Sequence, residues 1–176
     1  GRATPARAND PPATFVSTWD TESTSGGSSD DDQIALPLTS SGTYDFIVDW
    51  GDGSAPDEIT TWDQAETTHT FTEAGPQTIS ITGTISGFSF ANGGDRLKLT
   101  DVSEWGPLHL GNNGGYFYGA ENLDISAVDA PDLAGTTNMT NAFRGATALT
   151  ADLSGWETGS VTTMRSMFQG AVQFNS

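Results

Sequence analysis

Phe168-Gln169-Gly170-Ala171 is the third copy of a phrase that the chain has already used as Phe117-Tyr118-Gly119-Ala120 and Phe143-Arg144-Gly145-Ala146. The phenylalanines of successive copies are 26 and 25 residues apart, and each alanine is followed three residues later by Leu or Phe. A repeat of this length is one structural unit that cannot bury its apolar face alone, so successive copies should stack on one another. We therefore predict a short solenoid, with the three phenylalanines stacked as a ladder inside it.

The residues before the last copy suggest how one repeat folds. Val161, Met164, Met167 and Phe168 have the i, i+3, i+6 and i+7 spacing of an apolar stripe on a short helix, for which Ser160 is a suitable N-cap. The glycine of each phrase permits the turn out of the helix. The apolar residue after the phrase would then begin an extended segment that pairs in parallel with its counterpart one repeat away.

The chain ends at Phe174-Asn175-Ser176, where a further copy would be expected to begin. We expect the apolar face of the last copy to be covered by another subunit, and truncation of a longer repeat protein is the alternative. The subunit-contact candidates combine this end with two aromatic residues of the first predicted strand: Phe15, Trp19, Met164, Met167, Phe168 and Phe174.

Residues 15–105 have the alternating pattern of short strands. Tyr44, Phe46, Val48 and Trp50 fall on one face by period two, and Gly51-Asp52-Gly53-Ser54 after them supplies a hairpin turn. Residues 78–85 alternate in the same way, and Phe88 and Phe90 continue the alternation. Short strands at regular spacing with turns between them predict a β-sandwich.

Two resemblances to known families follow from these stretches. Trp50-Gly51-Asp52-Gly53-Ser54, followed by Thr68-His69-Thr70-Phe71, resembles the PKD-type immunoglobulin-like domain. Asp152-Leu153-Ser154-Gly155-Trp156 and Met164-Arg165-Ser166-Met167-Phe168-Gln169-Gly170-Ala171 resemble the repeat of BspA-like leucine-rich-repeat surface proteins. Gly111-Asn112-Asn113-Gly114-Gly115 departs from that repeat, because it stands where a Met-containing phrase is usual.

The resemblances imply a mainly β chain: an immunoglobulin/PKD-like β-sandwich followed by a short leucine-rich-repeat-like solenoid with short helices. We expect an extended N-terminal arm over residues 1–14, the sandwich over 15–106 and the solenoid over 107–176. In the sandwich, Trp50 and Trp105 occupy positions that imply core, and His69 is implied to be a structural residue that hydrogen-bonds nearby backbone. Trp156 has no counterpart in the other copies, which suggests a surface aromatic.

The charge of the chain limits its partners. Its 23 acidic residues outnumber 6 basic ones, for a formal net charge of −17, and Lys98 is the only lysine. Nucleic-acid binding needs the opposite balance, because phosphates are contacted by Lys and Arg. Solubility at high salt, a calcium-loaded surface and a well-solvated acidic secreted protein remain open as explanations of the excess acid. The sequence contains no run of about 18 apolar residues, so no membrane-spanning helix is predicted.

The sequence indicates binding or assembly rather than catalysis. No cysteine is present, the two histidines are far apart, and no serine lies in a Gly-x-Ser-x-Gly turn. Asp30, Asp31, Asp32, Asp49 and Asp52 offer oxygen ligands suited to Ca²⁺, although EF-hand spacing is absent and solvated or turn-capping carboxylates are the alternative.

Our hypothesis is a non-enzymatic, secreted or cell-surface structural protein that associates head to tail into a filament or surface array through its solenoid end and N-terminal arm. Adhesion to a host or neighbour-cell protein or glycan is the alternative. Trp62, in a polar stretch, is the glycan-contact candidate, and Asn138-Met139-Thr140 is an acceptor triplet for glycosylation.

Overall fold

The protein is mainly β. The computed structural model describes residues 13–175. Residues 1–12 of the predicted arm over residues 1–14 lie outside the described residues. The strands are β1 (Phe15–Asp20), β2 (Gln33–Ala35), β3 (Leu38–Asp49), β4 (Asp57–Ile59), β5 (Thr68–Thr70), β6 (Pro76–Phe88), β7 (Leu99–Glu104), β8 (Leu108–His109) and β9 (Asp124–Ile125), and a 3-10 helix η1 (Ala65–Thr67) precedes β5.

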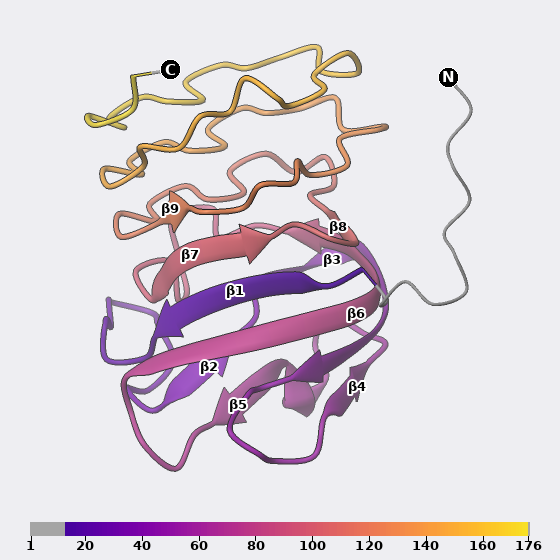
Figure 1. Cartoon of the computed structure of the whole chain (residues 1–176), viewed down its shortest axis with the longest axis vertical. Helices are drawn as coiled ribbons and strands as arrows, with labels where there is room; N and C mark the ends of the chain where they lie inside the picture. The colour runs from indigo at the N-terminus through magenta and orange to yellow at the C-terminus, as the bar shows by residue number, and fades with distance from the viewer. Residues whose placement is uncertain (1–12, 176) are drawn as a thin grey trace.

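Most strands form one mixed sheet. The order in this seven-stranded sheet is β4-β3-β6-β1-β7-β9, with β8 paired to β6, and β2 and β5 form a separate two-stranded sheet. The β6–β8 and β7–β9 pairs are parallel, whereas the other pairs are antiparallel. The long strands cross the lower half of the molecule, with β7 and β9 leading upward into the C-terminal turns (Figure 1).

The hairpin predicted from the alternating pattern is present. Tyr44, Phe46 and Val48 of β3 are buried while the residues between them are exposed, and Phe46 pairs with Ile59 of β4. Trp50 is fully buried after β3, and its Nε1 donates a 2.8 Å hydrogen bond to Asp57 Oδ2. Period-two burial therefore sets which face of β3 points into the core, as the sequence predicted.

His69 differs from its expected role. Its ring stacks on Trp50 with centroids 4.7 Å apart, and its Nε2 lies 2.8 Å from Asp52 Oδ2. The partner is thus a side-chain carboxylate of the turn after β3 rather than nearby backbone, and the contact joins that turn to β5.

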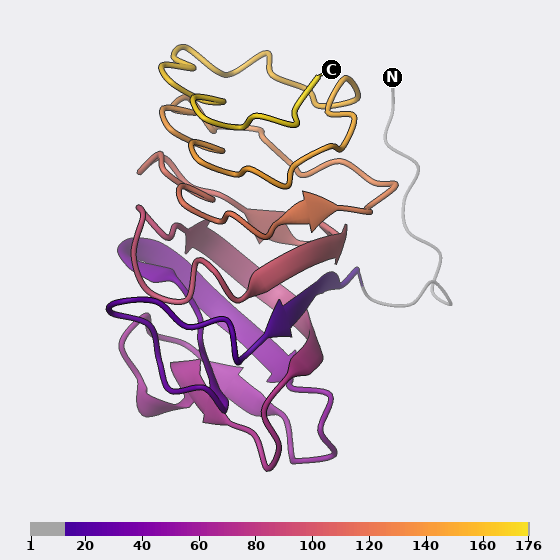
Figure 2. The ribbon, with the colours of Figure 1, turned by 90° about the vertical axis from the view of Figure 1, so that its left-hand side faces the viewer.

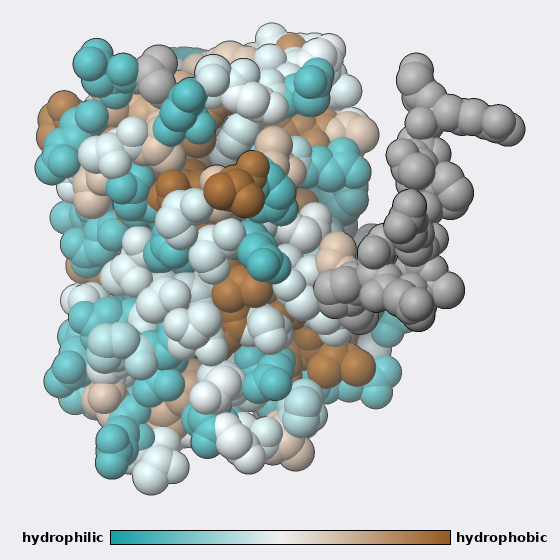
Figure 3. Space-filling view, in the orientation of Figure 1, coloured by the Kyte–Doolittle hydropathy of each residue, from teal (hydrophilic) through white to brown (hydrophobic). Residues whose placement is uncertain are grey.

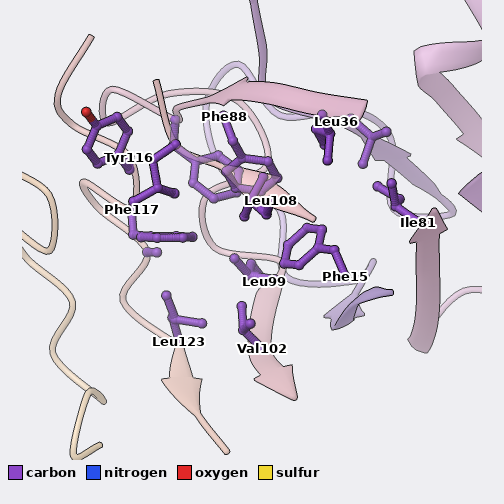
Figure 4. Packing of buried hydrophobic residues seen from close by; sticks show 14 of the residues in the cluster. Phe15, Leu36, Ile81, Phe88, Leu99, Val102, Leu108, Tyr116, Phe117 and Leu123 are labelled. Atoms are coloured by element: carbon purple, nitrogen blue, oxygen red, sulfur yellow. The ribbon is translucent and has the colours of Figure 1, made fainter. Parts of the chain in front are cut away.

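The hydrophobic core runs without interruption from the sheets into the C-terminal turns. Phe15 of β1 packs edge-on to Phe88, with ring centroids 5.7 Å apart, and Phe88 lies 5.7 Å from Phe117. Figure 4 shows Leu99 of β7 beside Phe15, with Val102 below Leu99 and Leu123 of the following turn to the left of Val102. The buried set joins both halves of the chain in one cluster.

The C-terminal part is a stack of irregular turns (Figure 2). Phe117 and Phe143 stack with ring centroids 5.2 Å apart, and Phe143 and Phe168 with centroids 5.8 Å apart, so the predicted ladder is confirmed. The predicted short helices are wrong: residues 160–168 form turns and one isolated bridge residue, Thr163. Val161 and Met164 are not buried with Met167, as a helical stripe would require.

The stack begins earlier in the chain than the repeated phrase shows. The Phe90 N–H donates to Tyr116 O and the Asn92 N–H to Tyr118 O, the same pattern by which Phe117 donates to Ala142 O one turn later. Asn92 also has the positive φ, +64°, that Gly119 has at +80°. Phe90 therefore opens the first turn of the stack, although its alternation with Phe88 resembled the end of a strand.

Candidate functional site

Two columns of left-handed residues shape every turn of the stack. The glycine of the phrase has φ +80°, +73° and +78° at Gly119, Gly145 and Gly170. A Cβ on Gly145 would lie 3.8 Å from the Gly119 Cα, so this column also lets neighbouring turns approach closely. The second column has φ +58°, +57° and +54° at Gly115, Asn141 and Ser166, and therefore places a strained conformation on two residues that carry side chains.

Backbone hydrogen bonds join consecutive turns at alternate residues. Met139, Asn141, Phe143 and Gly145 donate their N–H groups to carbonyls of the next turn, at 2.8–2.9 Å. The corresponding residues of the last turn are 25 positions further on: Met164, Ser166, Phe168 and Gly170. Within residues 13–175 none of these four N–H groups has an acceptor. Among the described residues, the last turn thus has a row of four N–H donors without an acceptor.

An apolar groove lies beside this row of donors. It has a volume of about 210 Å³ and is lined by Leu153, Ser154, Trp156, Thr158, Met164, Met167, Phe168 and Phe174. Phe174 stacks on Phe168 with ring centroids only 4.1 Å apart, so the chain itself covers one face of the last ladder ring. Met164 keeps 46% of its surface exposed. We call the four donors and this groove the end face.

The subunit-contact candidates divide into surface and core residues. Met164 is exposed, and Phe168 and Phe174 are half-buried in the end face. Phe15 and Trp19 are fully buried, and Met167 is 6% exposed. Phe15 and Trp19 fill the core beneath β1, so these two predictions are wrong, whereas Met167, although nearly buried, lines the end-face groove.

Trp156 belongs to this site, although its place in the sequence suggested a surface aromatic. Instead of standing on the surface, its ring packs edge-on to Trp105 at 5.4 Å and tilts against Phe143 at 5.7 Å. It also lines the end-face groove. Alignment of the repeats carried no indication of this, because no other copy has an aromatic residue at that place.

Two of the metal-ligand candidates are used by the turn after β3. Asp49 Oδ1 accepts the Gly51 N–H at 2.9 Å, and Asp52 Oδ1 accepts the Ser54 N–H at 3.0 Å. Hydrogen bonds from Ser54 and from His69 hold the pKa of Asp52 well below its usual value. Both carboxylates stabilise the turn, which is the alternative that the sequence left open.

The three consecutive aspartates lie in a loop that is held by the only lysine. Lys98 is fully buried, and its Nζ donates to the carbonyls of Ser29, Asp30 and Gln33 at 2.6–3.2 Å. The buried carboxylate of Asp95 lies 3.8 Å from Nζ. Among residues 13–175 no three His, Cys, Asp or Glu side chains form a metal-ligating group, so Asp30, Asp31 and Asp32 are not brought together as ligands.

The remaining candidates lie apart from the end face. Trp62 is 47% exposed in the loop after β4. Asn138 is half-buried: its Oδ1 accepts the Thr140 N–H at 3.0 Å, and its Nδ2 donates to Asn112 O at 3.3 Å. Attachment of a glycan to Asn138 would require the second of these bonds to break.

Large exposed apolar side chains are scattered over the described residues. They are Ile47, Trp62, Val128, Met164 and Val172. One face of the molecule accordingly shows separate brown areas among teal ones, over the sheet and over the turns (Figure 3). None of the helices within residues 13–175 has the length and hydrophobicity needed to cross a lipid bilayer.

Fold and site together define a mainly β protein whose C-terminal half is built from stacked turns of about 25 residues. The chain belongs to the family described as "Mycoplasma protein of unknown function, DUF285", whose model matches residues 86–176. The match begins four residues before Phe90, in agreement with the first turn of the stack. No curated protein and no solved structure matches the chain.

Proposed function

We propose that the protein is a non-enzymatic, secreted or cell-surface structural protein that associates head to tail through its end face. The observation that carries this proposal is the row of four N–H groups on the last described turn that lack an acceptor within residues 13–175, at positions whose counterparts in the preceding turn are all paired. A row of unpaired backbone donors, like the edge of a strand, can bind extended polypeptide through main-chain hydrogen bonds. The adjoining apolar groove adds surface that becomes buried on binding.

The finer fold assignment belongs to the same proposal. We assign residues 15–106 to a PKD-type immunoglobulin-like sandwich, in which the residues from Phe90 onward also form the first turn of the stack, and residues 107–176 to a BspA-like solenoid. The resemblance of Trp50-Gly51-Asp52-Gly53-Ser54 carries the first assignment, and the phenylalanine ladder supports the second. A cell-surface location follows from the resemblance to BspA-like proteins, which are surface proteins.

The proposed occupant of the end face is the N-terminal arm of a second copy. The other end of the stack cannot serve, because Phe90 of the first turn packs against Trp19 of β1 at 5.9 Å. Residues 1–14 include three prolines, which keep their carbonyl acceptors but have no N–H group. Such a segment is rich in acceptors and matches a row of donors. Arg2 and Arg7 also give the arm positive charge opposite a chain of net charge −17.

Sedimentation velocity over a range of concentrations tests the proposal. The full chain should form concentration-dependent oligomers. Removal of residues 1–12 and the variant Met164→Glu should each leave a monomer, and a synthetic peptide of residues 1–14 should compete with assembly. Asp63→Asn, in the distant loop after β4, serves as the control and should assemble normally.

Three results would contradict the proposal. A full chain that stays monomeric at every concentration, also in concentrated salt, excludes self-association. Assembly that survives Met164→Glu excludes the end face, and assembly that survives removal of residues 1–12 excludes the arm as its occupant.

A further inference from the structure

A second hollow lies on the side of the stack, where the first turns meet β3. Its volume is about 730 Å³, and it adjoins a smaller hollow of about 260 Å³ with which it shares Thr39 and Asn113. The joint space is within the range of small-molecule binding sites. We call the two hollows the side groove.

The side groove is uncharged, although the protein is strongly acidic. Its lining from both hollows contains Gly, Ala, Ser, Thr and Asn residues and Tyr118, without Asp, Glu, Lys, Arg or His. It also contains no Leu, Ile, Val, Met or Phe. A ligand that carries charge or large apolar groups would find no complementary group in it, whereas a ligand with many neutral hydroxyl groups would.

Several polar groups of the side groove have no partner within residues 13–175. Asn113 accepts a hydrogen bond from Ser41 Oγ at 3.1 Å, which leaves its Nδ2 free. The side-chain amide of Asn141 and the hydroxyl of Tyr118 make no hydrogen bond, while the Arg144 guanidinium lies 5.1 Å from the Tyr118 ring centroid. Amide and phenol groups both donate and accept, so they can pair with neighbouring hydroxyls of one ligand.

Other groups of the lining are fixed and hold the shape of the groove. Ser89 Oγ donates to Gly114 O at 2.9 Å, and both polar atoms of Asn138 are used within the stack. Two left-handed residues, Ala91 at φ +46° and Asn141 at φ +57°, also lie in the lining. Backbone strain of this kind is concentrated at binding sites.

Several of the residues that line the side groove come from a part of the sequence that is not explained by packing of the repeats alone. Asn113, Gly114 and Gly115 come from the stretch in which the chain departs from its own repeat. The repeated phrase builds the ladder, and this departure instead supplies amide and glycine residues to the surface.

We propose that the side groove binds a neutral carbohydrate. A peptide ligand is disfavoured, because the lining offers no apolar pocket for a side chain. This inference does not depend on self-association, since Met164 and the rest of the end face take no part in the groove.

A printed glycan array first selects neutral saccharides as probes. The full chain is then titrated with these saccharides, and NMR of its backbone and side-chain amides tests the inference. Shifts should be confined to Asn113, Asn141 and the glycines beside Asn113. Asn141→Gly removes the amide and keeps the left-handed backbone, and Tyr118→Phe removes only the hydroxyl. Each should weaken binding by about tenfold, the loss expected for one hydrogen-bonding group.

Control variants separate this site from the other surfaces. Asn175→Ala, Trp62→Ala and Met164→Glu should bind the saccharide unchanged. Absence of binding to every neutral glycan would overturn the inference, as would binding that is lost in Trp62→Ala but retained in Asn141→Gly. Shifts of the groove residues by peptides, without any by saccharides, would also overturn it.

Discussion

Ser166 adopts a left-handed conformation, φ +54°, in a column where the first phrase of the stack has Gly115 at φ +58°. A residue with a side chain pays about 1–2 kcal/mol of strain in the left-handed region. Glycine avoids this strain, but its greater conformational freedom in the unfolded chain offsets part of the gain in stability. Ser166→Gly should therefore raise the free energy of unfolding by about 0.5–1 kcal/mol. Urea denaturation measures the change.

The control for Ser166→Gly is Ser160→Gly, an exposed serine without a positive φ. This second change only adds freedom to the unfolded chain, so it should lower the free energy of unfolding slightly. Equal effects from both variants would mean that strain at residue 166 does not limit stability.

Asp52 should make stability depend on pH. Its pKa is lowered in the folded protein by hydrogen bonds from Ser54 and His69, so the folded state favours the ionised carboxylate. This contribution is complete above the pKa of an unfolded aspartate, about 4, and is lost as the pH falls toward the lowered folded value. Asp52→Asn should thus be destabilised at pH 7, with a difference from wild type that shrinks in acid. Thermal melts from pH 7 to pH 2.5 measure it, and a difference that is constant with pH would contradict the assignment.

Single residues show what the sequence could and could not predict. The spacing of Phe117, Phe143 and Phe168 predicted the ladder, because stacking repeats place equal residues at equal depth. The contact of Trp156 with Trp105 depends on how chain segments 51 residues apart meet, and no local pattern encodes it. Phe90 was assigned to a strand because alternation with Phe88 is the pattern of a strand, while the turn begins there through hydrogen bonds to the next repeat.

At the scale of elements, Lys98 orders the acidic loop of residues 21–32. Three carbonyls of that loop and of β2 accept hydrogen bonds from its Nζ, and Asp95 accepts others from Ser29 and Ala35. Burial lowers the pKa of Lys98, and Asp95 acts against this. Lys98→Met would leave these acceptors and a buried carboxylate without their cation, which costs about 3–5 kcal/mol.

Hydrogen exchange distinguishes this effect from general destabilisation. In Lys98→Met, amides of the acidic loop and of β2 should exchange faster, while Arg165→Met, an exposed loss of one positive charge, should leave them unchanged. Unchanged protection in Lys98→Met would show that the loop is held by other contacts. The sequence could not predict this arrangement, because Ser29 and Asp95 are 66 residues apart.

The ladder should lose stability unevenly along its length. Phe143 is fully buried between two other rings, so Phe143→Ala should lower the free energy of unfolding by about 3–5 kcal/mol. Phe168 is half-buried in the last turn, and Phe168→Ala should cost about 1–2 kcal/mol. Equilibrium denaturation measures both, and equal losses would contradict the end position of Phe168.

Helical spacing predicts the wrong structure for the same turns. Val161, Met164, Met167 and Phe168 have helical intervals, yet Ser166 between them is left-handed and interrupts any helix. A left-handed residue other than glycine has no clear sequence signature, so the period alone favoured the wrong element.

At the scale of the whole molecule, self-repulsion should make stability rise with salt. The formal charge of −17 is spread over a chain whose only lysine is buried, so surface acids have few positive partners. The Debye length shortens from about 10 Å at 0.1 M salt to about 3 Å at 1 M, which screens repulsion between exposed carboxylates. The melting temperature should therefore rise between these NaCl concentrations, most steeply at the low end.

A variant with fewer charges separates screening from other effects of salt. Asp63, Glu73 and Glu157 are exposed, and their side chains make no hydrogen bond or ion pair within residues 13–175. The triple change Asp63→Asn, Glu73→Gln and Glu157→Gln should raise the melting temperature at 0.1 M NaCl and flatten its increase with salt, because less repulsion remains to be screened. A variant with the same slope as wild type would show that salt acts through apolar burial instead. The result bears on assembly as well, since copies that repel one another must overcome the same charge before the end face of one can bind the arm of the next.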